Sequence, residues 1–182
     1  MLIALSGTPG TGKSSVSARL QKEGYTTVSL NELAIDKNMI VGIDKKRNTK
    51  IIDVDRLDDY VHEQYTGKDL VFIEGHSSHR LTSAEKVMIL RCHPRMLQKR
   101  LENQGWDHKK IRENVEAEAL DIILCETVEL HFEKHIFEID TTDKTVESVV
   151  SSIVEIVTNK FQPMKNYKIG NIDWSEEIFT EF

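Results

Sequence analysis

The chain has 182 residues, which is enough for one domain with a substantial core. Charged residues make up 30% of it and the net charge is -6, so we expect no direct nucleic-acid binding, although a basic protein partner stays compatible. No apolar run is long enough to span a membrane, and no secretory signal pattern opens the chain. Two cysteines, Cys92 and Cys125, are too few for a disulfide framework, so we expect both to be reduced and buried in a cytoplasmic protein.

The first predicted strand covers residues 1–5, and a helix is expected over residues 15–22. The loop between them, GTPGTGKS, fits the P-loop pattern G-x-x-x-x-G-K-S/T. Its glycines let backbone N–H groups point at phosphate oxygens, while Lys13 can reach the outer phosphates and the Ser14 hydroxyl can ligate Mg²⁺. We therefore predict binding of ATP with Mg²⁺, through Gly10, Thr11, Gly12, Lys13, Ser14 and Ser15.

Residues 26–28 form a β-prone run, and Ser29 with Glu32 has the capping-box spacing that begins a helix. Residues 36–50 are polar and basic, which is typical either of a solvated loop or of a mobile arm that presents cations to a second, anionic substrate. Asp55 can then cap a helix that carries an apolar stripe.

A continuous apolar run over residues 70–73 predicts a strand that is buried on both faces. It ends in Glu74, Gly75 and His76, so a carboxylate follows the strand directly. In P-loop proteins a carboxylate at this place can hold Mg²⁺, and a nearby histidine can act on the transferred phosphate. We assign Glu74 to the metal and His76 to catalysis.

The second half of the chain continues the alternation of strands and helices. A strand over residues 86–91 leads to a helix that starts at Pro94, and after a break at residues 104–107 Asp107 can cap a long helix. The last strand covers residues 136–140 and turns at Thr141 into an amphipathic helix.

Strands that alternate with helices predict an α/β fold, in which helices cover both faces of a parallel sheet. Ligands of such sheets gather at the carboxyl ends of the strands. The P-loop, Glu74 to His76, and Thr141 all map to that edge. We therefore expect one single-domain P-loop NTPase with Thr141 near the nucleotide.

The short chain, its N-terminal P-loop and the RLENQGW stretch at residues 100–106 resemble the nucleoside monophosphate kinases. The finer resemblance is to the adenylate kinase isoenzyme six family, and it rests on GTPGTGKS, IDVDR at residues 52–56, EGH at residues 74–76 and KIREN at residues 110–114. It covers residues 1 to about 160. It implies an adenylate kinase with ATPase activity, whose relatives also act in small-ribosomal-subunit assembly through a ribosomal-protein partner.

By position, the resemblance implies that residues 29–53 are the acceptor-nucleotide arm and residues 103–113 a short lid. It implies catalytic roles for Lys13, His76 and Arg100. Many relatives carry an arginine where this chain has Ile35, and another where it has Gln104 in the lid. Because such cations stabilise transition-state charge, both differences shift weight toward the alternative of an ATP-hydrolysing assembly factor. Arg80, Lys109, Arg112 and the basic run at residues 45–47 can compensate.

Residues 163–182 form an acidic C-terminal extension with interspersed apolar side chains. One interpretation is that it packs against its own domain, and the other is that its aromatic residues anchor a protein partner.

Overall fold

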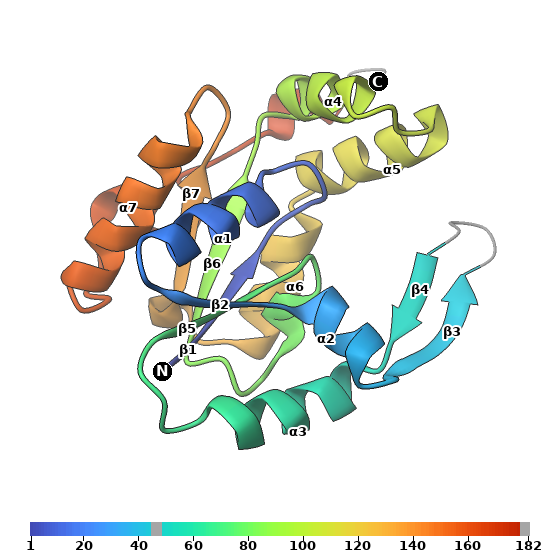
Figure 1. Ribbon diagram of the computed structural model, residues 1–182. Helices are drawn as coiled ribbons and strands as arrows, with labels where there is room; N and C mark the ends of the chain where they lie inside the picture. The colour runs from blue at the N-terminus through green and yellow to red at the C-terminus, as the bar shows by residue number, and fades with distance from the viewer. Residues whose placement is uncertain (45–48, 179–182) are drawn as a thin grey trace.

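The structure, a computed structural model, describes residues 1–44 and 49–178. Within them a parallel sheet has the strand order β2-β5-β1-β6-β7, with helices on both faces (Figure 1). The predicted fold class is thereby confirmed. The strands are β1 (Leu2–Ser6), β2 (Thr26–Ser29), β5 (Val71–Glu74), β6 (Lys86–Arg91) and β7 (Ile136–Asp140).

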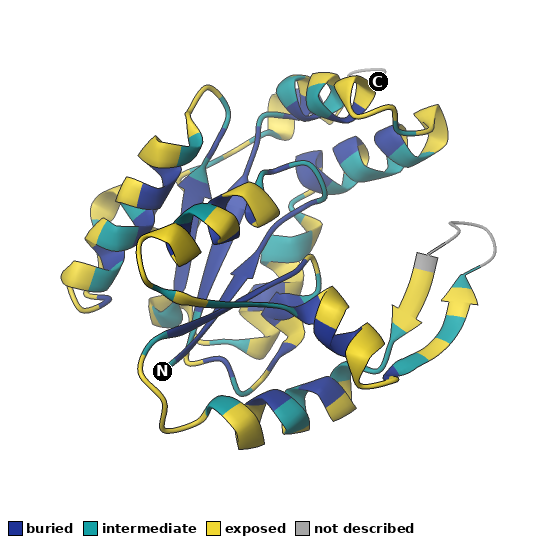
Figure 2. Ribbon diagram, viewed as in Figure 1, coloured by how far each residue is buried: buried dark blue, intermediate teal, exposed yellow. Residues whose placement is uncertain are grey.

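The central strand β1 explains the two-sided core, because its successive side chains point to opposite faces. Leu2 and Ala4 belong to one apolar cluster, and Ile3 and Leu5 belong to the other. All four are at most 2% exposed, and each fully buried leucine or isoleucine contributes about 1.5–3 kcal/mol. Figure 2 shows β1, β5, β6 and β7 as the most buried part of the molecule.

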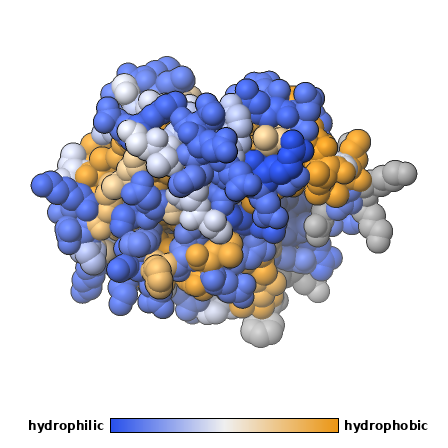
Figure 3. Space-filling model, turned by 90° about the horizontal axis from the view of Figure 1, so that it is seen from below, coloured by the Kyte–Doolittle hydropathy of each residue, from blue (hydrophilic) through white to orange (hydrophobic). Residues whose placement is uncertain are grey.

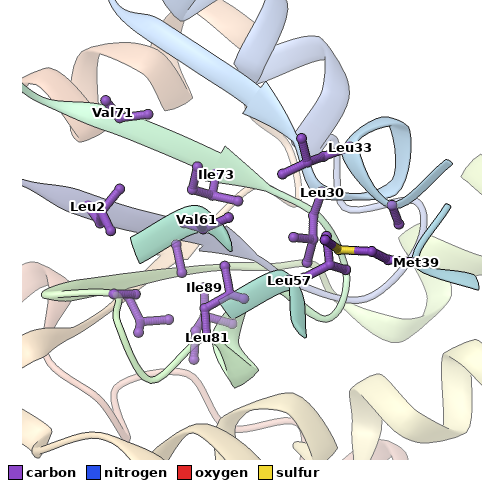
Figure 4. Packing of buried hydrophobic residues seen from close by; sticks show 14 of the residues in the cluster. Leu2, Leu30, Leu33, Met39, Leu57, Val61, Val71, Ile73, Leu81 and Ile89 are labelled. Carbon is purple, nitrogen blue, oxygen red and sulfur yellow. The ribbon is translucent and has the colours of Figure 1, made fainter. Parts of the chain in front are cut away.

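Among the described residues, five helices cover the sheet. On one face α2 (Leu30–Asp36), α3 (Val54–Tyr65) and α6 (Ile122–Leu130) pack against β1, β5 and β6. Figure 4 shows Val61 of α3 beside Ile73, and Leu57 of α3 beside Leu30 and Met39. On the other face lie α1 (Lys13–Lys22) and α7 (Val146–Thr158). The remaining two, α4 (Pro94–Asn103) and α5 (His108–Ala119), share a separate small core with Trp106.

Of the two interpretations left open for residues 36–50, the solvated loop is wrong, and so is the expectation that Asp55 caps the next helix. Instead of a solvated loop, this stretch contains the antiparallel strands β3 (Ile40–Asp44) and β4 (Thr49–Ile52), which project as an arm beside the sheet (Figure 1). The basic run at residues 45–47 lies outside the described residues. The cap of α3 is Asp53, whose carboxylate accepts from the Arg56 N–H, because α3 begins one residue before Asp55.

The stretch after Asp107 also differs from expectation. Asp107 caps α5, but the helix ends at Ala119 and Asp121 adopts a left-handed conformation (φ 54°) before α6 begins. Cys125, on α6, is exposed rather than buried, whereas Cys92 is buried as expected. Among the described residues, no helix is long and apolar enough to cross a membrane.

The described part of the C-terminal extension lies against its own domain. Tyr167 is buried and donates to the Glu155 carboxylate of α7, and the Gly170 N–H donates to Glu138 of β7. Farther along, Trp174 packs edge-on against His93, and Glu177 forms an ion pair with Arg95.

Candidate active site

A cavity of about 900 Å³ opens at the carboxyl ends of β1 and β5. This volume is typical of sites for small molecules or cofactors. Its walls come from the P-loop, the start of α2, the arm, the segment after β5, the turn between α4 and α5, and α6. Of the residues assigned from the sequence, it brings together Gly10, Gly12, Lys13, Ser14, Ser15, Glu74, His76 and Gln104.

The P-loop wraps tightly because two of its glycines adopt backbone angles that other residues avoid. Gly10 has φ 93°, and a Cβ there would lie 2.8 Å from Leu97 of α4. Gly12 has φ 102° and forms the N-cap of α1, so the helix N-terminus faces the cavity. The turn is closed from within, since the buried Thr11 hydroxyl donates to the Thr8 carbonyl. The Thr11 side chain therefore lies beneath the loop and does not line the cavity.

Lys13 is folded back onto the loop. Its Nζ donates to the carbonyls of Gly7 (2.7 Å) and Thr8 (3.0 Å). Burial lowers its pKa to about 8, against the opposing effect of the nearby Glu74 and Glu118 carboxylates. A phosphate in the cavity would offer this ammonium a stronger, charged acceptor than the two carbonyls.

The end of β5 supplies a carboxylate and an imidazole. Glu74 is buried at 9% exposure, and His76, two residues later, is exposed in the cavity. Desolvation by the cavity walls, followed by the positive charge of Lys13, lowers the pKa of His76 below its ordinary value. The Glu74 carboxylate and the exposed Ser14 hydroxyl are hard oxygen donors, a set that fits Mg²⁺.

Arg100 and Thr141 lie apart from the cavity lining. The Arg100 guanidinium donates to the carbonyls of Thr141 (2.5 Å) and Thr142 (2.8 Å). The buried Thr141 hydroxyl lies 3.1 Å from the Thr11 carbonyl of the P-loop. Both residues thus support the loop that follows β7 and its contact with the P-loop.

Several lining residues were missed or left open by sequence reasoning. Among the cations offered as compensation, Arg80 lines the cavity, whereas Lys109 and Arg112 do not. Two lysines not singled out as ligands, Lys50 of β4 and Lys110 of α5, line it as well. Further lining groups are Asn31, Trp106, His79, Asn114 and Glu126. The lid resemblance included Trp106 and the 110–114 stretch, but no short motif marks His79 or Glu126.

A buried ionic cluster lies beneath the P-loop. Arg91, the last residue of β6, is 1% exposed, and its guanidinium contacts Glu118 of α5 (2.8 Å), Glu138 of β7 and Asp121. Glu118 also accepts a hydrogen bond from the Thr8 hydroxyl. The cluster therefore connects the α5–α6 junction and β7 to the nucleotide loop.

Comparison with known proteins agrees with this geometry. Residues 3–121 match the family described as AAA domain. A protein of Archaeoglobus fulgidus named "Putative adenylate kinase" is 41% identical over 178 residues, which cover 98% of this chain and 94% of the relative. A protein of Methanosarcina barkeri with the same name is 39% identical, over 98% of this chain and all of the relative. The chain belongs to this archaeal family.

Solved structures show the same fold outside the family. Shikimate kinase from Acinetobacter baumannii superposes with a TM-score of 0.61 at 16% identity, covering 87% of this chain and 93% of that one. Shikimate kinase from Bacteroides thetaiotaomicron gives a TM-score of 0.58 at 15% identity, covering 87% of this chain and 98% of that one. At such identities the likeness concerns the fold alone.

Proposed function

We propose that the chain is a Mg²⁺-dependent adenylate kinase, which transfers the γ-phosphoryl group of ATP to AMP or another nucleoside monophosphate and also hydrolyses ATP. The observation that carries this proposal is one cavity in which an intact P-loop faces Glu74, His76 and cations from the arm and α5. The names of the archaeal relatives support the same reaction class.

In this reaction the bond from the γ-phosphorus to the bridging oxygen breaks, and a phosphate oxygen of AMP forms the new bond, giving two ADP. Lys13 would exchange the Gly7 and Thr8 carbonyls for phosphate oxygens, and the N–H groups of the P-loop would hold the rest of the phosphate chain. A bound Mg²⁺, held by Ser14 and Glu74, would supply charge neutralisation. His76 would orient the attacking oxygen at the end of β5.

A second candidate is an ATP-hydrolysing assembly factor for the small ribosomal subunit, acting through a ribosomal-protein partner. Two observations favour it. The cavity side of the α4–α5 turn carries the neutral Gln104, and Arg100 is engaged with backbone carbonyls. Fewer cations are then at hand for transition-state charge, although Arg80, Lys50 and Lys110 line the same cavity.

The deciding experiment measures ADP formation from ATP with and without AMP, and phosphate release in parallel. We expect AMP to stimulate ADP formation well beyond phosphate release. Lys13→Ala should abolish both signals, whereas Lys22→Ala, at the exposed far end of α1, should abolish neither. Phosphate release without AMP-dependent ADP formation would overturn the kinase assignment and leave the second candidate.

A further inference from the structure

His79 is a buried histidine beside the cavity that the proposed reaction does not use. It lies in the short helix η1 (Ser78–Arg80) after β5 and is 2% exposed. Its Nδ1 is 3.0 Å from the Ser6 hydroxyl, and its Nε2 is 2.9 Å from a carboxylate oxygen of Glu126 on α6. Since both ring nitrogens have protein partners, His79 cannot exchange a proton directly with a bound substrate.

Ser6 extends this chain of hydrogen bonds to the segment that carries His76. It is the last residue of β1, directly before the P-loop, and its hydroxyl donates to the His76 carbonyl at 3.1 Å. On the other side, the His131 imidazole at the end of α6 lies 2.7 Å from the His79 carbonyl. Helix α6 thus contacts His79 at both its ring and its backbone.

These contacts join three separate elements around one side chain. Burial gives weight to the contact between His79 and Ser6, because an unpaired polar group in this place loses its solvation without compensation. The Glu126 side chain is 49% exposed, so its contact with His79 is partly solvated. The segment 75–80 has turn hydrogen bonds of its own, from the Ser78 N–H to Gly75 and from the Arg80 N–H to Ser77. They shape the turn but do not attach it to β1 or to α6. The backbone bond to β1, from the Gly75 N–H to the Leu5 carbonyl, lies before His76 and leaves residues 76–80 to the side-chain contacts.

We propose that His79 is a positioning residue, which through Ser6 and Glu126 fixes the segment 75–80 so that His76 faces the phosphate end of the cavity. This inference rests on the proposed function, and it assigns to the Ser6–His79–Glu126 chain the task of orienting His76 for phosphoryl transfer. Loss of these hydrogen bonds between Ser6, His79 and Glu126 should leave nucleotide binding intact, because no P-loop ligand is removed. It should lower kcat instead.

The test uses variants that keep one end of the chain at a time. His79→Asn places an amide where Nδ1 lies and can keep the bond to Ser6, whereas His79→Gln can reach only Glu126. We expect His79→Ala and His79→Gln to lower kcat about tenfold or more, with ATP affinity changed by less than about twofold, and His79→Asn to restore most of the rate. Ser6→Ala should reproduce the loss and also serves if His79→Ala fails to fold.

The matched control is Leu81→Val, a packing change at a fully buried neighbour outside the hydrogen-bonded chain. It should lower thermal stability while kcat stays near that of the wild type. If kcat follows thermal stability in all variants, or if His79→Asn and His79→Gln are equally impaired, the positioning role is wrong.

Amide hydrogen exchange of residues 75–80 gives a readout that does not depend on activity. His79→Ala and Ser6→Ala should speed exchange at Ser78 and Arg80, whereas Leu81→Val should do so only in proportion to its lost global stability. Unchanged exchange in both variants would overturn the inference. A wild-type protein without phosphoryl transfer would overturn the proposed function alone, since the exchange experiment still reports on the chain.

Discussion

Replacing Arg91 by methionine tests whether the ionic cluster beneath the P-loop stabilises the fold. The substitution keeps an unbranched apolar stem and removes the cation that Glu118 and Glu138 share, at exposures of 3% and 1%. Some compensation survives, because Glu118 also accepts from the Cys92 N–H and Glu138 from the Gly170 N–H. Asp121, whose side chain is 31% exposed, can turn to solvent.

The expected loss follows from leaving buried charges without their counterion. Removing one partner of a buried ion pair costs about 3–5 kcal/mol. Against a total stability of about 5–15 kcal/mol, such a loss leaves the domain marginal. At about 2–4 °C per kcal/mol for a chain of this size, the melting temperature should fall by about 6–20 °C.

The deficit should depend on pH with a definite sign. Burial raises the pKa of Glu138 and of Asp121, and the charge of Arg91 acts in the opposite direction. A carboxyl with a raised folded-state pKa destabilises the fold when ionised, so stability returns as the pH falls through that pKa. Without Arg91 both pKa values should rise further. The deficit of Arg91→Met should therefore shrink between about pH 7 and about pH 5.

Urea unfolding at the two pH values measures both effects. Arg19→Met is the matched control, because Arg19 forms its ion pair with Glu23 on the surface of α1, where the two side chains are 41% and 35% exposed. It should cost no more than about 1 kcal/mol. A loss of that size in Arg91→Met, or a deficit that grows on acidification, would refute the reasoning. Restoration by adding Glu118→Gln and Glu138→Gln would identify the unpaired charges as the cause.

Three further predictions concern the cavity. Gln104→Arg should add a charge-assisted phosphate contact that lowers the activation free energy of the kinase reaction, or strengthens ATP binding, by at most about 1.5–3 kcal/mol. If steady-state kinetics show neither change, another cation already contacts the phosphate there. Glu74→Ala should impair both kinase and ATPase activity. His76→Ala should damage ATP hydrolysis more than AMP phosphorylation, because AMP brings a positioned nucleophile and water does not. Equal losses of the two rates in His76→Ala would contradict this division. ATP affinity, measured by equilibrium titration, should fall as the pH rises through about 8, because Lys13 then loses the proton that binds phosphate. An ATP affinity that does not change up to about pH 9 would speak against that role.

The sheet and the P-loop could be predicted from the sequence because their signals are local. The runs at residues 70–73 and 87–90 are apolar without alternation, as strands covered on both faces must be, and the structure has β5 and β6 there. The P-loop needs glycines and a lysine at fixed spacing, so neighbouring residues alone define it.

The resemblance placed an arm at residues 29–53, but its two strands could not be predicted because they bury little. Val41 and Ile43 are each 62% exposed and Ile51 is 48% exposed, so the hairpin lacks the pattern of one buried and one polar face. Figure 3 shows hydrophobic residues gathered toward the right of the molecule, the side on which the arm lies in Figure 1. A prediction that relies on a buried apolar face assigns a loop to such a stretch, in which apolar side chains stand among lysines and polar residues.

Long-range pairing explains the other omissions. Arg91 meets its carboxylates 27 to 47 positions away along the chain, and His79 meets Ser6 and Glu126 at separations of 73 and 47. The helix break at Asp121 belongs with them, since the carboxylate of this left-handed residue binds Arg91. No spacing rule along one element can find partners that only the folded sheet brings together.

The P-loop is held from two sides by Glu118 and Ser6, which do not line the cavity. From below, Glu118 binds the Thr8 hydroxyl and is itself fixed by Arg91. From the β5 side, Ser6 directly before the loop bonds to the His76 carbonyl and to His79. Lys13 now contacts the loop carbonyls of Gly7 and Thr8. With support from both sides, the loop would keep its shape when Lys13 exchanges these carbonyls for a phosphate. Because a preorganised site spends little free energy on reorganisation, this support favours catalysis by positioning and charge, which is most of what phosphoryl transfer asks of a protein.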